Sequence, residues 1–119
     1  MAEFVMLICG DEKALAALPE EERAATFGKV GAWWAEQEAA GRIMRERGHR
    51  LQPSHTARTV RFNGSGATVT DGPFAETREV LGGYGIIIAP DIDAAVAVAK
   101  SWPGDASTIE VRPVYPPMG

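Results

Sequence analysis

Two short, uninterrupted apolar runs constrain the fold more than any other feature of the sequence. "FVMLIC" at 4–9 is closed by Gly10 and Asp11, and "YGIIIA" at 84–89 is closed by Pro90. Apolar runs of this length that end at turn-forming residues are typical of buried strands. Each run is followed by a segment whose apolar residues recur with helical spacing. The sequence therefore predicts two strand–helix units that share one core.

The segment after the first run predicts a long helix. Pro19 fits the first helical position, and the glutamates at 20–22 complement the positive end of a helix dipole. Gly41 is expected to end the helix. The apolar stripe has 3-4-3 spacing and consists of Ala24, Phe27, Gly31 and Trp34.

The two adjacent tryptophans of this helix are predicted to face different surfaces. Trp33 lies about 100° around the helix from Trp34 and therefore falls off the apolar stripe. One of the two is expected to cover a second surface, for which a subunit interface is the natural candidate.

The remaining elements follow from turn signals and periodicity. An extended segment is expected to begin at Ile43 and Met44 and to end at Pro53. Residues 60–62 and 67–70 flank an Asn-Gly-Ser-Gly turn and predict a hairpin. "DIDAAVAVAKSW" at 91–102 predicts a helix capped by Asp91, and "STIEVRPV" at 107–114 alternates as a strand does.

The order β-α-β-(hairpin)-β-α-β predicts a single ferredoxin-like α+β domain over residues 1–119. Right-handed crossovers place both helices on one face of an antiparallel sheet. The other face is too apolar for water, so a second copy of the chain is expected to cover it. We expect a homodimer whose sheets pack face to face.

Composition narrows the classes of function. The net charge of −4 argues against nucleic acid as a partner, because its binding needs a clustered positive surface. No apolar run approaches the roughly 20 residues that span a bilayer, and the N-terminus lacks the basic start of a signal peptide. One cysteine excludes an intramolecular disulfide. A cytoplasmic protein without a membrane partner is expected.

The stretch "TDGPFAETREVLGGYGIII" at 70–88 resembles the signature of the DGPF subgroup of the YCII-related family. The resemblance continues at "LQP" (51–53), "ARTVRF" (57–62) and "IEVRPV" (109–114). It implies a dimeric α+β barrel fold and a bacterial protein, since members of the subgroup are often associated with extracytoplasmic-function sigma factors. For YCII-like proteins it also implies small-molecule chemistry at a His–Asp pair in a pocket. Many members have a histidine in the first helix, where this chain has "KVG" at 29–31, and this departure weakens the transfer of a His–Asp mechanism.

The loop "DGPFAETRE" at 71–79 supplies the first candidate site residues. Asp71 heads the turn, where its carboxylate can either accept hydrogen bonds from the backbone two or three residues on or act as a general base in a pocket. Gly72 can adopt a positive φ. Phe74 can fill a gap in the core, and it is also a candidate ligand-binding residue. If the loop borders a cleft, Glu76 is the carboxylate expected to bind a ligand, because it lies beside the rigid Gly-Pro-Phe unit. The alternative for these charges is a solvated, ion-paired loop.

The strands supply the other candidates. Glu110 and Arg112 share one strand face, where they either pair with each other or leave Arg112 to hold a carboxylate ligand. Tyr84 can lend a hydroxyl to a pocket, although its glycine neighbours favour a bulge or close packing over nucleotide binding. His49 could approach Asp71 and rebuild a His–carboxylate pair, or lie exposed at a strand end. Neither histidine has a partner at metal-ligand spacing, so neither a metal nor a cofactor is expected.

Three hypotheses about function follow. In the first, a homodimer binds a small organic ligand, an organic acid for example, in a cleft whose rim is the loop at 71–79, and acts as an accessory or regulatory protein. In the second, it is a cofactor-free lyase or isomerase in which Asp71 or His49 is the base and Arg112 holds a carboxylate. In the third, the loop contacts another protein and the domain is purely structural.

Overall fold

The computed structural model describes residues 1–104 and 107–116 of the chain. Its strands are β1 (Ala2–Gly10), β2 (His49–Arg50), β3 (Arg58–Phe62), β4 (Ala67–Asp71), β5 (Val80–Ala89) and β6 (Ser107–Pro113). Its α-helices are α1 (Glu12–Ala17), α2 (Glu20–Ala39) and α3 (Ile92–Lys100). Two short 3-10 turns, η1 (Arg45–Arg47) and η2 (Ser54–Thr56), flank β2. In this described part, no helix is both long and apolar enough to cross a membrane.

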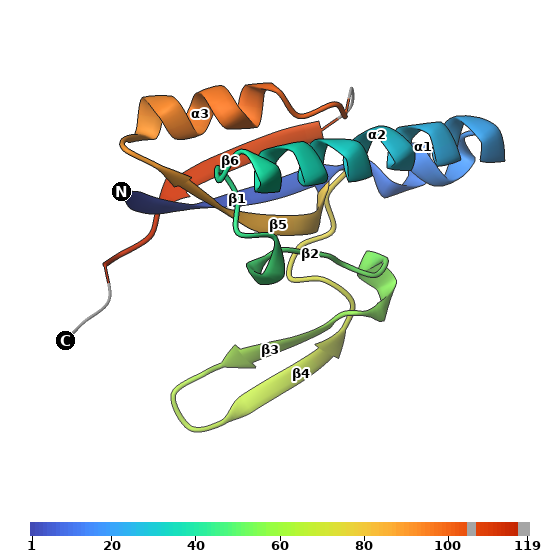
Figure 1. The fold of residues 1–119 in the computed structure, drawn as a ribbon. Coiled ribbons are helices and arrows are strands. Elements are labelled where there is room, and N and C mark those ends of the chain that lie inside the picture. The colour runs from blue at the N-terminus through green and yellow to red at the C-terminus, as the bar shows by residue number, and fades with distance from the viewer. Residues whose placement is uncertain (105–106, 117–119) are drawn as a thin grey trace.

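A four-stranded antiparallel sheet with strand order β2-β5-β1-β6 forms the centre of the molecule. Helices α2 and α3 lie on the same face of this sheet (Figure 1). The predicted ferredoxin-like α+β architecture is therefore confirmed. The predicted hairpin forms as well, but β3 and β4 make a two-stranded sheet of their own.

Helix α1 is an element that the sequence analysis missed. The side chain of Asp11 caps it by accepting a hydrogen bond from the backbone N–H of Ala14 at 3.0 Å. The helix has only six residues and ends before Leu18, whose extended conformation is the one expected for a residue that precedes proline. So short a helix has no room for a repeating apolar stripe, which is why periodicity gives no signal there.

The core lies between the sheet and the two long helices. Phe4 pairs with Ile87 across β1 and β5, and Met6 pairs with Val111 across β1 and β6. Met6 and Ile87 are completely buried. Strand alternation places the intervening residues of β1 and β5 on the other face. The buried core cluster consists of Phe4, Met6, Trp33, Ile43, Ile87, Ala89 and Ala95.

The prediction that one tryptophan of α2 covers a second surface is wrong. Trp33 is buried in the core, Trp34 packs against the same cluster, and both make edge-to-face contacts with Trp102. Room for both rings exists because two glycines of other elements face Trp34. A Cβ added at Gly48 would lie 3.4 Å from the Trp34 ring, and one added at Gly85 would lie 2.6 Å from it.

The buried side of α2 also differs from the predicted stripe. Ala24 and Gly31 are exposed, whereas Gln37 is 4% exposed. The stripe is shifted because Trp33 and Gln37, four residues apart, are the buried residues of the helix. Gln37 is satisfied at this depth because its Oε1 accepts a hydrogen bond from Nη1 of Arg42 at 3.2 Å.

The glycines around Tyr84 serve the sheet, as predicted. The β1–β5 register shifts between Ile8, which pairs with Gly83, and Cys9, which pairs with Leu81, so a bulge falls at Gly82. Gly83 lies close to β2, since a Cβ there would approach the carbonyl oxygen of His49 at 3.2 Å. The glycines thus mark a bulge and a close strand approach.

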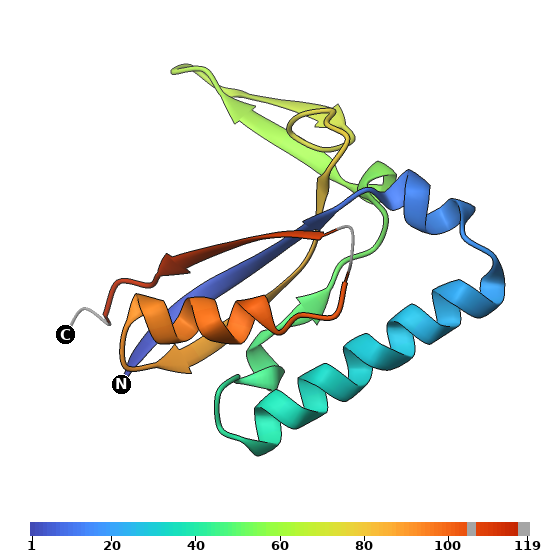
Figure 2. The ribbon, with the colours of Figure 1, turned by 90° about the horizontal axis from the view of Figure 1, so that it is seen from above.

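The hairpin of residues 58–71, called the arm below, projects from the body of the molecule. Figure 1 shows it on the side of the sheet that the helices leave uncovered, and Figure 2 shows it extending beyond the sheet. The radius of gyration is 16.2 Å, whereas a compact chain of this length has about 13.5 Å. The arm therefore makes the subunit much more extended than a closed domain.

Candidate functional site

The open face of the sheet, meaning the face away from α2 and α3, gathers half of the predicted site residues. The β1–β5, β1–β6 and β2–β5 registers align one row across the sheet, composed of His49, Tyr84, Leu7 and Glu110. The next row contains Ile86, Val5 and Arg112. An apolar centre formed by Val5, Leu7 and Ile86 is thus flanked by polar side chains at both edges.

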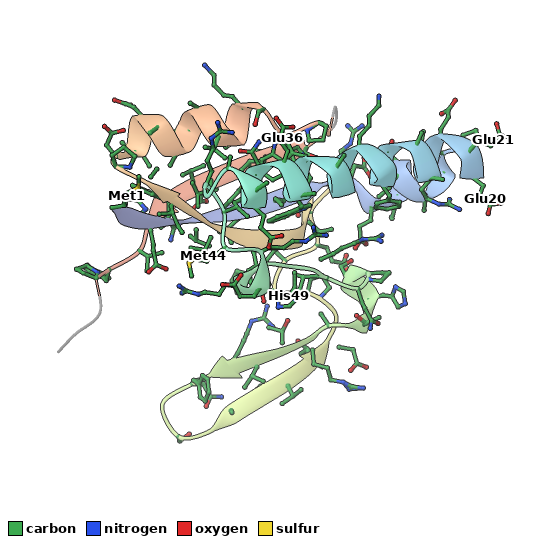
Figure 3. The ribbon with its side chains drawn as sticks, in the orientation of Figure 1. Met1, Glu20, Glu21, Glu36, Met44 and His49 are labelled. Atoms are coloured by element: carbon green, nitrogen blue, oxygen red, sulfur yellow. The ribbon has the colours of Figure 1, made fainter. Side chains whose placement is uncertain are left out.

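His49 and Tyr84 are brought together at one edge of this face. Their ring centroids are 5.9 Å apart with an interplanar angle of 61°. His49 is exposed and Tyr84 is half-buried. Figure 3 shows His49 on the side of the sheet opposite the helices. The pair can offer an imidazole and a hydroxyl to a molecule that reaches this edge.

Glu110 and Arg112 form an ion pair with each other at the opposite edge. Their side chains are 49% and 68% exposed, respectively. Residues two apart on a strand share a face, which is why the sequence predicts this neighbourhood. An ion pair as exposed as this contributes at most about 1 kcal/mol, so Arg112 can exchange Glu110 for another carboxylate at little cost.

Asp71 is placed on the arm, away from any enclosed site. Its Oδ1 accepts a hydrogen bond from Nη1 of Arg58 at 3.1 Å, and its side chain is 88% exposed. Among the described hydrogen bonds its carboxylate has neither His49 nor a following backbone N–H as partner. Gly72, the next residue, has the predicted positive φ, at 94°. Asp71 thus closes the base of the hairpin with an ion pair.

The expectation that Phe74 fills a gap in the core is wrong. Its side chain is 75% exposed because residues 72–79 run outside the core, between the arm and β5. The guanidinium of Arg61 lies 5.4 Å from the ring centroid, and its Nη2 donates to the Phe74 carbonyl at 3.0 Å. Glu76 is also exposed. Arg61 therefore supports the loop from the arm, in place of the core packing that was expected.

The later part of the same loop borders a hollow of about 690 Å³. The hollow is lined by Asp11, Ala14, Thr77, Arg78 and Glu79. The predicted rim is thus partly correct, because residues 77–79 border the hollow and Glu76 does not line it. Asp11 was missed as a site residue. Its only signal in the sequence is that of a helix cap, which does not say what else the carboxylate contacts.

Asp11 and Arg78 form the charged pair of this hollow. Oδ2 of Asp11 accepts a hydrogen bond from Nε of Arg78 at 3.1 Å. The backbone N–H of Ala14, and then the Arg78 side chain, hold the pKa of Asp11 below its usual range. Within the described part of the chain, the two terminal nitrogens of Arg78 have no hydrogen-bond partner. Arg78 is therefore oriented through Nε and keeps its outer edge free for an anion.

Glu79 and Cys9 join the hollow to the open face. Oε1 of Glu79 accepts a hydrogen bond from the hydroxyl of Thr108 at 2.8 Å. Burial, followed by the negative charges of Glu79 and Glu110, raises the pKa of the Cys9 thiol. A raised pKa keeps the thiol protonated at neutral pH, so Cys9 is not equipped to act as a nucleophile.

Glu12 fixes the frame behind the hollow by capping η2. Its Oε1 accepts from the backbone N–H of Ser54 at 2.6 Å, and its Oε2 accepts from the Ser54 hydroxyl at 2.7 Å. The Ser54 hydroxyl and then its N–H lower the pKa of Glu12 from the ordinary value of 4.5. The folded state therefore favours the ionised form of this carboxyl group.

Replacing Glu12 with glutamine is expected to lower the free energy of unfolding at pH 7 by about 1 kcal/mol, the scale of one capping interaction. Because folding depresses the pKa of Glu12, its contribution is complete above pH 4.5 and is lost as the pH falls through the folded-state pKa. Urea unfolding of the wild type and Glu12→Gln at a series of pH values measures this. A difference that stays constant down to pH 2.5 would contradict the assignment.

Two further features bear on where a site can lie. An apolar groove of about 410 Å³ lies between α3 and β6, lined among others by Val96, Trp102 and Ile109. No cluster of His, Cys, Asp and Glu side chains suited to holding a metal ion occurs among residues 1–104 and 107–116. The groove is lined mainly by apolar residues together with Lys100 and Ser107, whereas charged and polar side chains predominate in the hollow beside Arg78.

Comparison with known proteins gives a family and a relative of similar length. The model of the YCII-related domain matches residues 2–117. The chain is also similar to the uncharacterized protein R00369 of Rhizobium meliloti (strain 1021), with 30% identity over 114 residues. That match covers 93% of this chain and 90% of the relative.

Proposed function

The chain belongs to the YCII-related family, and within that family we propose that it is a homodimer that binds a small organic acid in the hollow beside Arg78. The observation that carries the proposal is the Asp11–Arg78 pair, which orients a guanidinium at the hollow and leaves its outer edge free. The role is binding, of an accessory or regulatory kind.

The geometry of Arg78 supports an anionic ligand. A guanidinium presents its N–H groups as a planar fork that matches a carboxylate, and two of its edges remain available when Nε is engaged. Arg78 is 89% exposed whereas its partner Asp11 is only 19% exposed, so the free end of the pair points to solvent. Thr77 lines the same hollow, and its hydroxyl donates to the Glu79 carbonyl, a contact within the loop that carries Arg78.

The volume of the hollow suits a small molecule. Pockets for small ligands measure about 300–1,000 Å³ and contain a few well-placed polar groups, and this hollow measures about 690 Å³. Its acidic residues are already engaged, Asp11 by Arg78 and Glu79 by Thr108. An incoming carboxylate therefore meets the terminal N–H groups of Arg78 as unengaged donors.

Catalysis by Asp71 or His49 has less support than binding. A general base is tuned by a partly dehydrated cleft, whereas Asp71 is 88% exposed and His49 is exposed at the sheet edge. Neither residue lines the hollow. The lyase or isomerase hypothesis would need these side chains to be enclosed by another molecule.

The open sheet face supports the homodimer. It carries Val5, Leu7 and Ile88 as half-buried residues and Leu81 as an exposed one, in the middle of the sheet where no helix lies. Apolar surface of this kind on a central strand is stabilised when a second sheet covers it. A two-fold axis through this face brings the same patch of both copies together, as an isologous dimer requires.

The proposal is tested by thermal unfolding in the presence of small mono- and dicarboxylic acids. A ligand at a hundred times its Kd is expected to stabilise the wild type by about 2.7 kcal/mol, and Arg78→Gln is expected to remove most of that shift. Arg58→Gln is the matched control, because Arg58 also forms one exposed ion pair, at 3.1 Å, but lies outside the hollow. Equal shifts in the wild type and Arg78→Gln would refute the site.

A further inference from the structure

The arm has one apolar side and one polar side. In β3 and β4 the register pairs Val60 with Val69 and Phe62 with Ala67, so these side chains share a side. Val60, Phe62 and Val69 are 50%, 83% and 59% exposed. The opposite side carries Thr59, Arg61, Thr68 and Thr70. Such an amphipathic hairpin is built to be covered on one side only.

Among residues 1–104 and 107–116, the hydrogen bonds and ion pairs made to the arm do not cover this apolar side. The hydroxyl of Thr59 donates to the Gly72 carbonyl, and Arg61 donates to the Phe74 carbonyl, both from the polar side. Arg58 and Asp71 pair with each other at the base. An isolated two-stranded hairpin is marginally stable in water. The apolar side of the arm therefore needs a surface that its own subunit does not supply.

The position of the arm identifies that surface as part of a second copy of the chain. The arm lies on the same side of the sheet as the open face (Figure 1). This is the face that the partner covers in the proposed dimer. The arm also extends past the sheet (Figure 2). It can therefore contact the side of a second copy that covers the open face. One two-fold contact then covers both unpartnered apolar surfaces, the open face and the arm.

Charge complementarity points to the same partner. The arm carries two arginines, Arg58 and Arg61, against one acidic residue, Asp71, while the whole chain has a net charge of −4. The arm is therefore a basic element and the remainder of each subunit is acidic. Opposite charges of this kind favour contact between the arm of one copy and the body of the other.

We propose that the apolar side of the arm, formed by Val60, Phe62, Ala67 and Val69, docks on a second copy of the chain, so that each subunit of the dimer is held by the arm of the other. This inference rests on the homodimer of the proposed function and adds a second contact to it. The arm thereby explains why the subunit is so extended.

The test compares dimer dissociation constants by analytical ultracentrifugation. The double variant Val60→Thr, Phe62→Thr keeps strand-forming residues but makes the apolar side polar, and its dissociation constant is expected to rise at least about tenfold. Thr68→Ser, Thr70→Ser on the polar side is the matched control and is expected to stay within about twofold. Near-ultraviolet circular dichroism checks that the tryptophan core is intact in each variant.

Amide hydrogen exchange provides the second readout. The backbone N–H groups of residues 58–71 are expected to be protected in the dimer and to lose protection on dilution to the monomer. Suppose that the wild type dimerises, that the double variant has the same dissociation constant, and that dilution leaves the amide protection of residues 58–71 unchanged. The arm inference is then overturned and the dimer stands. If the wild type is monomeric at every concentration, both the arm inference and the proposed dimer are overturned.

Discussion

Replacing Trp33 with alanine is expected to lower the free energy of unfolding by about 3–5 kcal/mol, the usual range for removing a buried tryptophan. Trp33 is 5% exposed and lies between the other two tryptophans, with ring centroids 5.4 Å from Trp34 and 5.0 Å from Trp102. Its Nε1 also donates to the Ser101 hydroxyl at 2.8 Å. The substitution therefore removes ring contacts, edge-to-face contacts and one hydrogen bond at once.

Thermal unfolding at a fixed protein concentration measures this loss, which corresponds to a fall in melting temperature of about 10–20 °C for a domain of this size. Trp33→Phe is the control that keeps an aromatic ring in the core, and it is expected to lose less than half as much. If Trp33→Ala left the melting temperature almost unchanged and instead weakened subunit association, Trp33 would be an interface residue and its placement in the core would be wrong.

Replacing Leu7 with glutamate is expected to raise the dissociation constant of the proposed dimer by at least about a hundredfold. Leu7 lies on β1, in the centre of the sheet, between Tyr84 and Glu110 on the open face. A two-fold interface receives the new carboxylate twice, so two desolvated like charges face each other near the axis. Because the substitution is on the face away from the helices, the core around Met6 is left intact.

Sedimentation velocity over a range of concentrations measures this change. Val96→Glu is the matched control, because it adds the same charge at a residue that is 39% exposed on α3. That variant is expected to dimerise as the wild type does. Equal association of wild type and Leu7→Glu would show that the dimer uses a different surface.

The elements that the sequence predicted correctly are those with local signals. The apolar runs became β1 and β5, the Asn-Gly-Ser-Gly turn closed a hairpin, and the side chain of Asp91 caps α3 by accepting from Ala94 at 2.8 Å. Period-two alternation was enough to place Glu110 and Arg112 together. In each of these cases the interacting residues are neighbours in the chain or follow directly from strand geometry.

The predictions that failed depended on distant residues. Both tryptophans of α2 reach the core because Gly48 and Gly85, on other elements, leave space for the Trp34 ring. No helical-wheel argument on α2 alone contains that information. Phe74 is outside the core because the whole segment that carries it leaves the sheet, which the composition of the loop does not reveal.

The candidate site shows the same limit. Asp11 and Arg78 are 67 residues apart, and they meet because β1 and β5 pair antiparallel with the end of one beside the start of the other. In the sequence, Asp11 has only the pattern of a helix cap and Arg78 only that of a charged loop residue. Neither pattern indicates that the two side chains meet. The loop was recognised as a rim from its rigid start, but the residues that line the hollow come from its end.

The most direct measurement is a two-dimensional amide NMR titration of the wild type with the carboxylic acid that gives the largest thermal shift. We expect the largest chemical-shift changes on the backbone amides of Ala14, Thr77, Arg78 and Glu79 and on the side-chain Nε–H of Arg78, and we expect Arg78→Gln to abolish them. Changes concentrated instead at His49 and Tyr84, or along the groove between α3 and β6, would contradict the proposed binding site.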